Sequence, residues 1–248
     1  MTFIIGHRGA RNEAPENTIG SFIHAQKHGC YAFELDVRLS KDNQLVVFHD
    51  RILGRMTGVN GLLSSFTAEQ LNNFDARGKI LWPYVCPIPK LRHVIESVPL
   101  TKDWQFEVKP TSLIRMRMLA TKLLQLIAEM HGQLGRVTIT SSSEWFLKEI
   151  KRRAPSQNTG LVSESRGLEA VERCKRLGCS LLVINKLQCS ETLVSESHKN
   201  GLEVSVWTVN NIEQMQKLVC MGVDSIITDV PSSAIQAISN ELPAFNHW

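Results

Sequence analysis

Short apolar runs alternate with segments of helical periodicity along most of the chain. Runs of this kind predict strands, whereas apolar residues three and four positions apart predict one face of a helix. The clearest helix covers residues 111–131, where Leu119, Leu123 and Leu126 lie on one stripe. The predicted strands lie near residues 3–7, 31–37, 44–49, 104–108, 136–140, 159–162, 181–184, 203–207 and 225–228. Repeated alternation of strand and helix is typical of a parallel sheet covered by helices.

One of these strands cannot run parallel to the strand before it. Only a turn at residues 40–43 fits between segment 31–37 and segment 44–49, and a parallel crossover needs about a dozen residues. Segment 44–49 is therefore expected to return as a hairpin near the mouth of the sheet. Eight strands remain, which is the number in a (β/α)8, or TIM, barrel. An open doubly wound sheet fits less well, since no glycine-rich phosphate loop follows the first strand.

Residues 50–89 interrupt the alternation. They contain four glycines, three prolines and one short predicted helix near 67–74. Glycine and proline at this density mark turns and loops, so the segment is expected to form an excursion over one end of the barrel. The whole chain, residues 1–248, is predicted to be one domain with an insertion at about 50–90.

The composition excludes several classes of protein. Hydrophobic residues make up 43% of the chain and charged residues 21%, as in ordinary soluble domains. The net charge of +4 is mildly basic, but no basic stripe interleaves with aromatic residues, so nucleic-acid binding is not expected. No stretch approaches the length of a membrane span, and the first apolar run is too short for a signal peptide. The six cysteines form no C-x-x-C pair, and several lie inside predicted apolar elements. A disulfide framework is not expected in a chain of this size, which favours a reducing, cytoplasmic location.

Carboxylates meet at the ends of two predicted strands, in Glu34-Leu35-Asp36 and Glu107-Val108-Lys109. Side chains two positions apart on a strand point the same way, so each triplet directs two ionisable groups to one face. Carboxylates aimed together are costly unless a cation or a shared proton joins them. Oxygen ligands alone favour Mg²⁺, Ca²⁺ or Mn²⁺ over zinc. We expect a hard metal ion with an anion held beside it.

Histidines complete the candidate chemistry. His7 ends the first predicted strand and His49 ends the hairpin strand, and in a parallel barrel the carboxyl ends of the strands build the active site. Each group also has a structural explanation: either histidine could be structural, Glu107 and Lys109 could form an ion pair, and Glu34 and Asp36 could cap loops or pair with Arg38. Their joint occurrence favours an active site.

Other signals are absent or weaker. His24 and His28 have a metal-ligand spacing, but their helix is expected on the outer ring with its polar face in water. Ser141, Ser142 and Ser143 form a run without the elbow of a nucleophilic serine, and no phosphate-binding loop or zinc-protease motif occurs.

In motif content and order, the chain resembles the glycerophosphodiester phosphodiesterase family along nearly its whole length. The matching motifs are Gly6-His7-Arg8-Gly9, Ala14-Pro15-Glu16-Asn17-Thr18, Glu34-Leu35-Asp36, Val47-Phe48-His49-Asp50, Ile88-Pro89-Lys90-Leu91, Glu107-Val108-Lys109, Trp207-Thr208-Val209-Asn210, and Gly222-Val223-Asp224 through Thr228-Asp229. The resemblance implies a TIM barrel of the phospholipase C-like phosphodiesterase type, with a small insertion after the His49 segment. It also implies hydrolysis of small-molecule glycerophosphodiesters to sn-glycerol 3-phosphate and an alcohol, with one divalent cation, Mg²⁺ or Ca²⁺, Mn²⁺ being a third candidate.

Site roles carry over from the matching motifs. The resemblance implies that Glu34, Asp36 and Glu107 are the metal ligands. It implies that His7 and His49 are the general acid and base.

The remaining matched residues are implied to hold the substrate. Arg8 and Lys109 correspond to phosphate contacts, and Trp207 corresponds to a wall of the glycerol pocket. Glu16 and Asn17 correspond to residues at the mouth that orient the first histidine or the metal shell.

Two positions depart from the family pattern. Arg55-Met56-Thr57 stands where the family often has Arg-Thr-Thr. Ser142-Ser143 stands where it often has Ser-Phe, which removes an aromatic ring near the mouth. The core set of acids, bases and cations is intact.

Two other functions stay open. A lysophospholipase D or phospholipase C-like lipid phosphodiesterase would need an apolar rim, for which residues 62–66 are the candidate. A non-hydrolytic binding protein for glycerophosphodiesters is less compatible with an intact histidine pair. The sequence leaves undecided the preferred alcohol, the metal, the first nucleophile (water or the glycerol 2-hydroxyl), which histidine is the base, and the oligomeric state.

Overall fold

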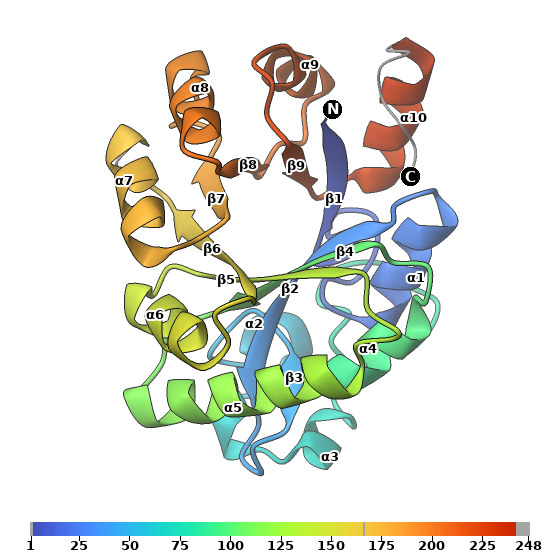
Figure 1. Cartoon of the computed structure of the whole chain (residues 1–248). Coiled ribbons are helices and arrows are strands. Elements are labelled where there is room, and N and C mark those ends of the chain that lie inside the picture. The colour runs from blue at the N-terminus through green and yellow to red at the C-terminus, as the bar shows by residue number, and fades with distance from the viewer. Residues whose placement is uncertain (1, 166, 242–248) are drawn as a thin grey trace.

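Eight parallel strands close into a barrel ringed by helices in the computed structural model, which describes residues 2–165 and 167–241 (Figure 1). The sheet order is β1-β9-β8-β7-β6-β5-β4-β2, and pairing of β1 with β2 closes the ring. The barrel strands are β1 (Phe3–His7), β2 (Ala32–Leu39), β4 (Asp103–Val108), β5 (Arg136–Ser141), β6 (Asn158–Ser163), β7 (Leu181–Asn185), β8 (Glu203–Trp207) and β9 (Ser225–Thr228). The predicted TIM barrel is confirmed.

The hairpin strand is also confirmed. Strand β3 (Leu45–Val47) runs antiparallel to the last residues of β2, with Val37 opposite Val47. The turn between them places Asn43 at a φ of 58°, a left-handed conformation that asparagine tolerates better than most residues. The Gln44 N–H donates to Ser40 Oγ at 2.9 Å, which closes the turn. The Phe48 N–H donates to the Asp36 carbonyl at 3.0 Å, so this register carries His49 back along β2 to the neighbourhood of Asp36.

Helices cover the outer face of the barrel. They are α1 (Ile19–Lys27), α4 (Leu91–Ser97), α5 (Leu113–Glu129), α6 (Glu144–Arg153), α7 (Gly167–Leu177), α8 (Glu191–Lys199), α9 (Ile212–Cys220) and α10 (Pro231–Glu241). The sequence pattern did not predict α4. Its two turns are too short to establish a periodicity against the neighbouring prolines, and burial of Leu91, Val94 and Ile95 against the barrel stabilises it.

Alternation along the strands separates an apolar layer from a polar one. On β2, Phe33, Leu35 and Val37 point outward into the cluster under the helices. The rings of Phe22 and Trp104 pack around Phe33, with centroids 5.4 and 5.6 Å from it. The intervening residues of β2 point to the other face, so the outer core fixes which side chains enter the barrel.

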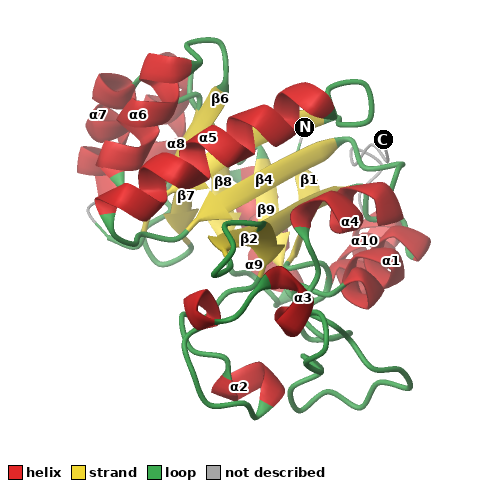
Figure 2. Ribbon diagram, turned by 90° about the horizontal axis from the view of Figure 1, so that it is seen from below, coloured by secondary structure: helices red, strands yellow, loops and turns green. Residues whose placement is uncertain are grey.

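The segment between β3 and α4 lies beyond the strand ends (Figure 2). It carries α2 (Gly54–Thr57), the 3-10 helix η1 (Leu63–Ser65) and α3 (Ala68–Leu71). The helix expected near 67–74 is shorter than predicted and is capped by Thr67. Leu53, Leu63 and Leu71 belong to a separate small apolar cluster. In the candidate apolar rim at 62–66, Leu63 is 2% exposed and packs in this cluster, whereas Leu62 is 36% exposed.

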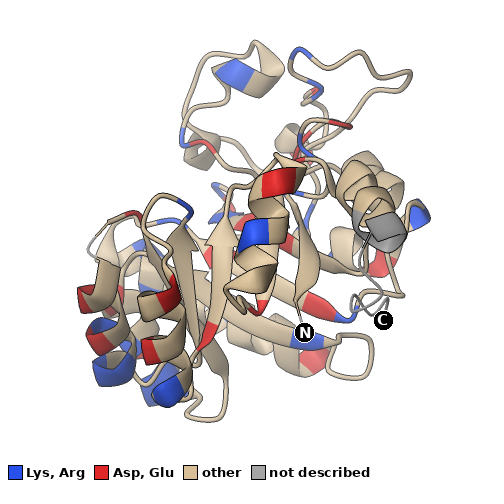
Figure 3. Ribbon diagram, turned by 90° about the horizontal axis from the view of Figure 1, so that it is seen from above, with Lys and Arg blue, Asp and Glu red and all other residues tan. Residues whose placement is uncertain are grey.

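Side chains elsewhere follow simple rules of burial. All six cysteines are free, and Cys30, Cys86, Cys174 and Cys179 are buried, as packing residues should be. Acidic and basic residues are mixed on the outer helices (Figure 3). No helix in the described ranges has the length and apolar character needed to cross a bilayer.

Candidate active site

A pocket of about 330 Å³ opens at the carboxyl ends of the barrel strands. Val162, Val183 and Ile227 form an apolar part of its lining. The remaining wall brings together most of the residues expected from the sequence: His7, Arg8, Glu34, His49, Glu107, Lys109 and Trp207. Residues more than 200 positions apart in the sequence thus share one cavity.

Three carboxylates meet beside this pocket. Glu34, Asp36 and Glu107 each offer an oxygen, and these oxygens lie within 4.8 Å of one another. Glu34 Oε1 is buried without a hydrogen-bond partner, and Lys109 Nζ lies 3.1 Å from the buried Asp36 Oδ1. Burial, together with the charges of Asp36 and Glu107, raises the pKa of Glu34 well above its usual range. Three carboxylates at this spacing, one with an oxygen that has no partner, fit a hard divalent cation.

Two cationic side chains flank the carboxylates. Lys109 Nζ lies 2.7 Å from Glu107 Oε1 and 3.1 Å from Asp36 Oδ1. Arg8 Nε lies 3.1 Å from Asp36 Oδ2. Although burial disfavours its charge, Asp36 is held ionised by Arg8 and Lys109, so its pKa lies far below the usual range. The same cations would attract an anion that enters the pocket.

His7 is held by an acid that the sequence analysis did not assign to the site. His7 Nδ1 lies 2.6 Å from Asp229 Oδ1, and Nε2 faces Glu34 at 3.7 Å. Asn210 donates to the other oxygen of Asp229 at 2.8 Å. Burial lowers the pKa of His7, and the bond to Asp229 opposes that shift. The position of Asp229 directly after β9 was the available signal, since strand ends build the site.

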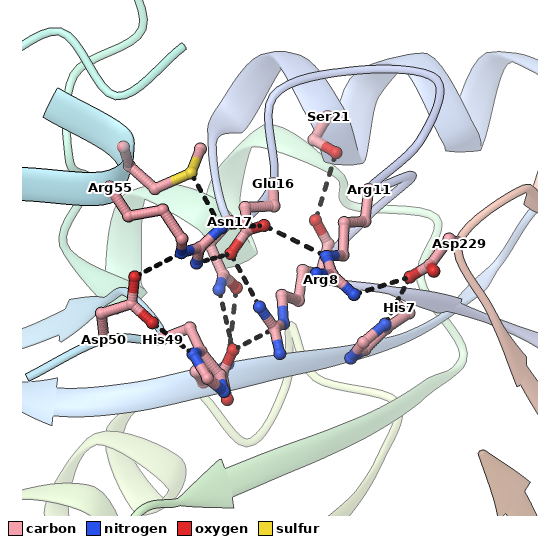
Figure 4. A network of polar contacts seen from close by, with 12 residues as sticks. His7, Arg8, Arg11, Glu16, Asn17, Ser21, His49, Asp50, Arg55 and Asp229 are labelled. Carbon is pink, nitrogen blue, oxygen red and sulfur yellow. Dashed lines mark hydrogen bonds and ion pairs between the residues drawn. The ribbon is translucent and has the colours of Figure 1, made fainter. Parts of the chain in front are cut away.

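His49 has a matching support from the segment that follows it. His49 Nδ1 lies 2.7 Å from Asp50 Oδ1, and Arg55 Nε donates to Asp50 Oδ2 at 2.5 Å (Figure 4). Burial lowers the pKa of His49. Arg55 also donates to Glu16 at 2.7 Å, and with these hydrogen bonds the pKa of Glu16 falls to about 2 despite burial. Both histidines thus present the same arrangement, with Nδ1 bound to an aspartate.

Glu16 and Asn17 contact the cation and the metal-ligand candidate rather than His7. Arg8 donates to Glu16 Oε1 at 2.7 Å, and Asn17 Nδ2 donates to Asp36 Oδ2 at 2.9 Å. Arg8 and Asn17 have φ values of 53° and 58°, a conformation uncommon for residues other than glycine. Strain of this kind persists where surrounding contacts fix the backbone.

The other expected residues divide between the pocket and the scaffold. Trp207 lines the pocket, and its indole N–H is buried without a partner. Ser142 also lines the pocket, whereas Ser141 donates to the Val108 carbonyl and is buried. The rings of His24 and His28 pack against each other on α1, outside the pocket.

Comparison with known proteins agrees with this geometry. The family model described as the glycerophosphoryl diester phosphodiesterase family matches residues 7–233. A glycerophosphodiester phosphodiesterase of Caldanaerobacter subterraneus subsp. tengcongensis is 33% identical over 96% of this chain and 98% of its own length. An Oleispira antarctica phosphodiesterase, solved with the product sn-glycerol-3-phosphate, has a TM-score of 0.87 at 26% identity and covers 96% of this chain and 97% of its own. A human lysophospholipase D is 38% identical over 39% of this chain and 33% of its own length.

Divalent cations are expected to stabilise the folded chain through the carboxylate cluster. Mg²⁺ or Ca²⁺ at about 100 times its dissociation constant should add about 2.7 kcal/mol to the free energy of unfolding. Glu34→Gln and Glu107→Gln should each remove most of that gain because each deletes one anionic ligand. Glu69→Gln, at an exposed position on α3, serves as the matched control. Urea denaturation with cation or EDTA measures the effect, and equal gains in all four proteins would contradict the assignment.

Proposed function

The chain belongs to the glycerophosphoryl diester phosphodiesterase family, and on that premise we propose that it hydrolyses glycerophosphodiesters to sn-glycerol 3-phosphate and an alcohol with one divalent cation. The observation that carries the proposal is a pocket lined by two aspartate-bound histidines, with three clustered carboxylates in or directly beside its wall. Mg²⁺ or Ca²⁺ is the proposed ion, with Mn²⁺ as a third candidate, because all the ligands are oxygens. The product reported with the Oleispira enzyme supports the same product here.

Charge compensation prepares the pocket for a phosphodiester. The single negative charge of a phosphodiester repels an attacking oxygen. This repulsion grows as negative charge develops on the equatorial oxygens of the phosphoryl group. Arg8 and Lys109 are proposed to bind the phosphoryl oxygens, since both lie beside the carboxylate cluster and line the pocket. The bound cation would supply further charge neutralisation and orient the phosphoryl group. Trp207 is proposed to form a wall for the glycerol moiety.

Proton transfer is assigned to the two histidines. Because each Nδ1 is bound to an aspartate, each Nε2 remains to act on substrate. One histidine removes a proton from the nucleophile, and the other protonates the departing oxygen. After the step, the first histidine is protonated and the second is neutral. Either water or the glycerol 2-hydroxyl meets the requirement for a nucleophile. Glu16 and Asn17 are proposed to orient Arg8 and the metal ligand Asp36.

A lipid substrate is the second candidate, and exposed apolar side chains near the mouth favour it. Ile114 is 73% exposed at the start of α5, and Leu187 is 82% exposed in the loop after β7. Both positions follow the carboxyl end of a barrel strand, so they flank the pocket entrance. The partial likeness to a lysophospholipase D adds support.

The remaining proposals concern organisation and location. We propose that residues 1–248 form one domain whose segment 50–90 is an insertion. Free cysteines throughout the chain support a cytoplasmic location.

Release of glycerol 3-phosphate is the direct test of the proposed function. Glycerophosphocholine, glycerophosphoethanolamine and glycerophosphoglycerol should each yield it with Mg²⁺, Ca²⁺ or Mn²⁺, and EDTA should abolish the signal. A coupled enzymatic assay follows the product, with micellar lysophosphatidylcholine as a parallel substrate. Turnover of lysolipid alone would favour the lipid phosphodiesterase over the glycerophosphodiester phosphodiesterase. Metal-dependent binding without turnover would indicate a non-hydrolytic binding protein.

Removal of either catalytic histidine should nearly abolish turnover. His7→Ala and His49→Ala are each expected to lower kcat by roughly 10²–10⁴ because general acid or base catalysis is lost. His28→Ala, at an exposed position on the outer helix layer, should leave kcat near that of the wild type. Circular dichroism verifies that the variants fold. Wild-type kcat in a folded His7→Ala or His49→Ala protein would refute that residue's role.

Asp229 is expected to position His7 and set its pKa. Burial lowers the pKa of His7, and Asp229 raises it. Asp229→Asn removes the group that raises the pKa, so the pKa of His7 should fall further. The limb of the pH–kcat profile that His7 carries should move to lower pH whether His7 is acid or base, and kcat should fall by about 10². Asp224→Asn is the matched control, since Asp224 binds His198 at 2.8 Å outside the pocket. An unmoved profile in Asp229→Asn would rule out this role.

A further inference from the structure

A second pocket of about 330 Å³ adjoins the active site. The two pockets share Lys109 and Pro110 in their linings. Arg38, Arg51 and Arg115 line the second pocket together with Lys109, and neither aspartate nor glutamate lines it. The active-site pocket, by contrast, includes Glu34, Glu107 and Glu164. The second cavity is thus uniformly cationic beside a cavity of mixed charge.

The three arginines form no direct ion pair in the part of the chain that the structure describes, and Asp36, Asp50 and Glu107 act on Arg38 from a greater distance. Within residues 2–165 and 167–241, no carboxylate oxygen lies within 4.0 Å of the guanidinium of Arg38, Arg51 or Arg115. Arg8 and Arg55, near the active site, each contact carboxylates at that range. Clustered guanidinium groups without counter-charges repel one another, and an incoming anion would relieve that repulsion.

Hydrogen bonds to neutral carbonyl groups hold two of these arginines in place. Arg38 Nε donates to the His49 carbonyl at 2.8 Å. Arg115 donates to the carbonyls of Leu39 and Ser40 at 2.7 and 3.1 Å. These bonds fix the guanidinium positions without cancelling their charge. A site organised in advance loses less conformational entropy when an anion binds.

Neighbouring groups add to the positive potential. Helix α5 begins at Leu113, and its N-cap Ser112 makes no side-chain capping bond and no acidic residue occupies the first turn. The unsatisfied N–H groups of a helix N-terminus favour anions. Ser64, Thr111 and Ser112 also line the pocket and carry polar groups able to donate to phosphate oxygens.

We propose that this second pocket binds a phosphomonoester on the alcohol portion of the substrate. The chain would then prefer glycerophosphodiesters whose alcohol carries its own phosphate. Lys109, common to both pockets, marks the route by which the alcohol passes from the scissile phosphate to this subsite. A dianion matches three arginines that form no direct ion pair with the described residues better than a carboxylate or a neutral hydroxyl does. The inference rests on the proposed function and names the substrate class of that site.

The test compares two substrates that differ by one group: glycerophosphoglycerol, and the same diester with a terminal phosphate. In the wild type, kcat/KM should be higher for the phosphorylated diester. Arg51→Gln should lower that selectivity ratio roughly tenfold, since one charge-assisted contact is lost. Arg115→Gln should act in the same direction. Glycerophosphoserine, with a carboxylate on its alcohol, should gain less from the arginines than the phosphorylated diester.

Arg117→Gln is the matched control. It removes the same charge from the same helix, but Arg117 packs over the Trp145 ring at 5.7 Å and does not line the pocket. Its selectivity ratio should equal that of the wild type. Arg51 is exposed and its side chain has no hydrogen-bond or ion-pair partner in the described part of the chain, so Arg51→Gln should fold even if Arg115→Gln does not. Thermal melting verifies this.

Failure of the inference differs from failure of the proposed function. A wild-type selectivity ratio in folded Arg51→Gln would overturn the subsite while leaving hydrolysis intact. Absence of product from every diester would refute the proposed function instead. In that case calorimetric titration with the phosphorylated diester still decides: weaker binding to Arg51→Gln than to Arg117→Gln supports the subsite, and equal binding overturns it.

Discussion

Compensation of buried charge is the constraint on which this structure depends. Glu34 and Asp36 are 3% and 0% exposed, and buried carboxylates are costly unless cations or hydrogen bonds offset them. Arg8 and Lys109 supply that offset and are themselves oriented by it. The cost is tolerated because alternate residues of the same strands bury apolar side chains against the outer helices. The barrel thus carries its buried charges at the mouth, and apolar packing under the outer helices stabilises the fold.

The segment between β3 and α4 contributes residues to the site. Arg55, on α2, bonds to Asp50 and to Glu16, which in turn accepts a hydrogen bond from Arg8. One chain of contacts therefore runs from His49 through Asp50, Arg55 and Glu16 to Arg8. Arg38 and Arg51 place the second pocket in the same region, between this segment and α5. We therefore expect contacts of this segment to affect both substrate selection and catalysis.

Local pattern was enough to predict much of the fold. Alternating strands and helices predicted the barrel, and the short turn at residues 40–43 predicted the antiparallel hairpin. Helix α4 escaped prediction because seven residues carry little periodicity of their own. In the candidate rim, the sequence could not tell the exposed Leu62 from the buried Leu63, because an apolar residue looks the same whether it faces solvent or a local core.

The sequence by itself determined which chemical groups reach the barrel mouth, because period-two alternation and strand ends are local properties. Only the tertiary structure decided which groups are partners. Closure of the barrel pairs β1 with β9 and brings His7 to Asp229, 222 positions away. The insertion brings Arg55 to Glu16, and packing against α5 gathers the arginines of the second pocket. Such contacts depend on how distant segments meet, and no local pattern of residues encodes that.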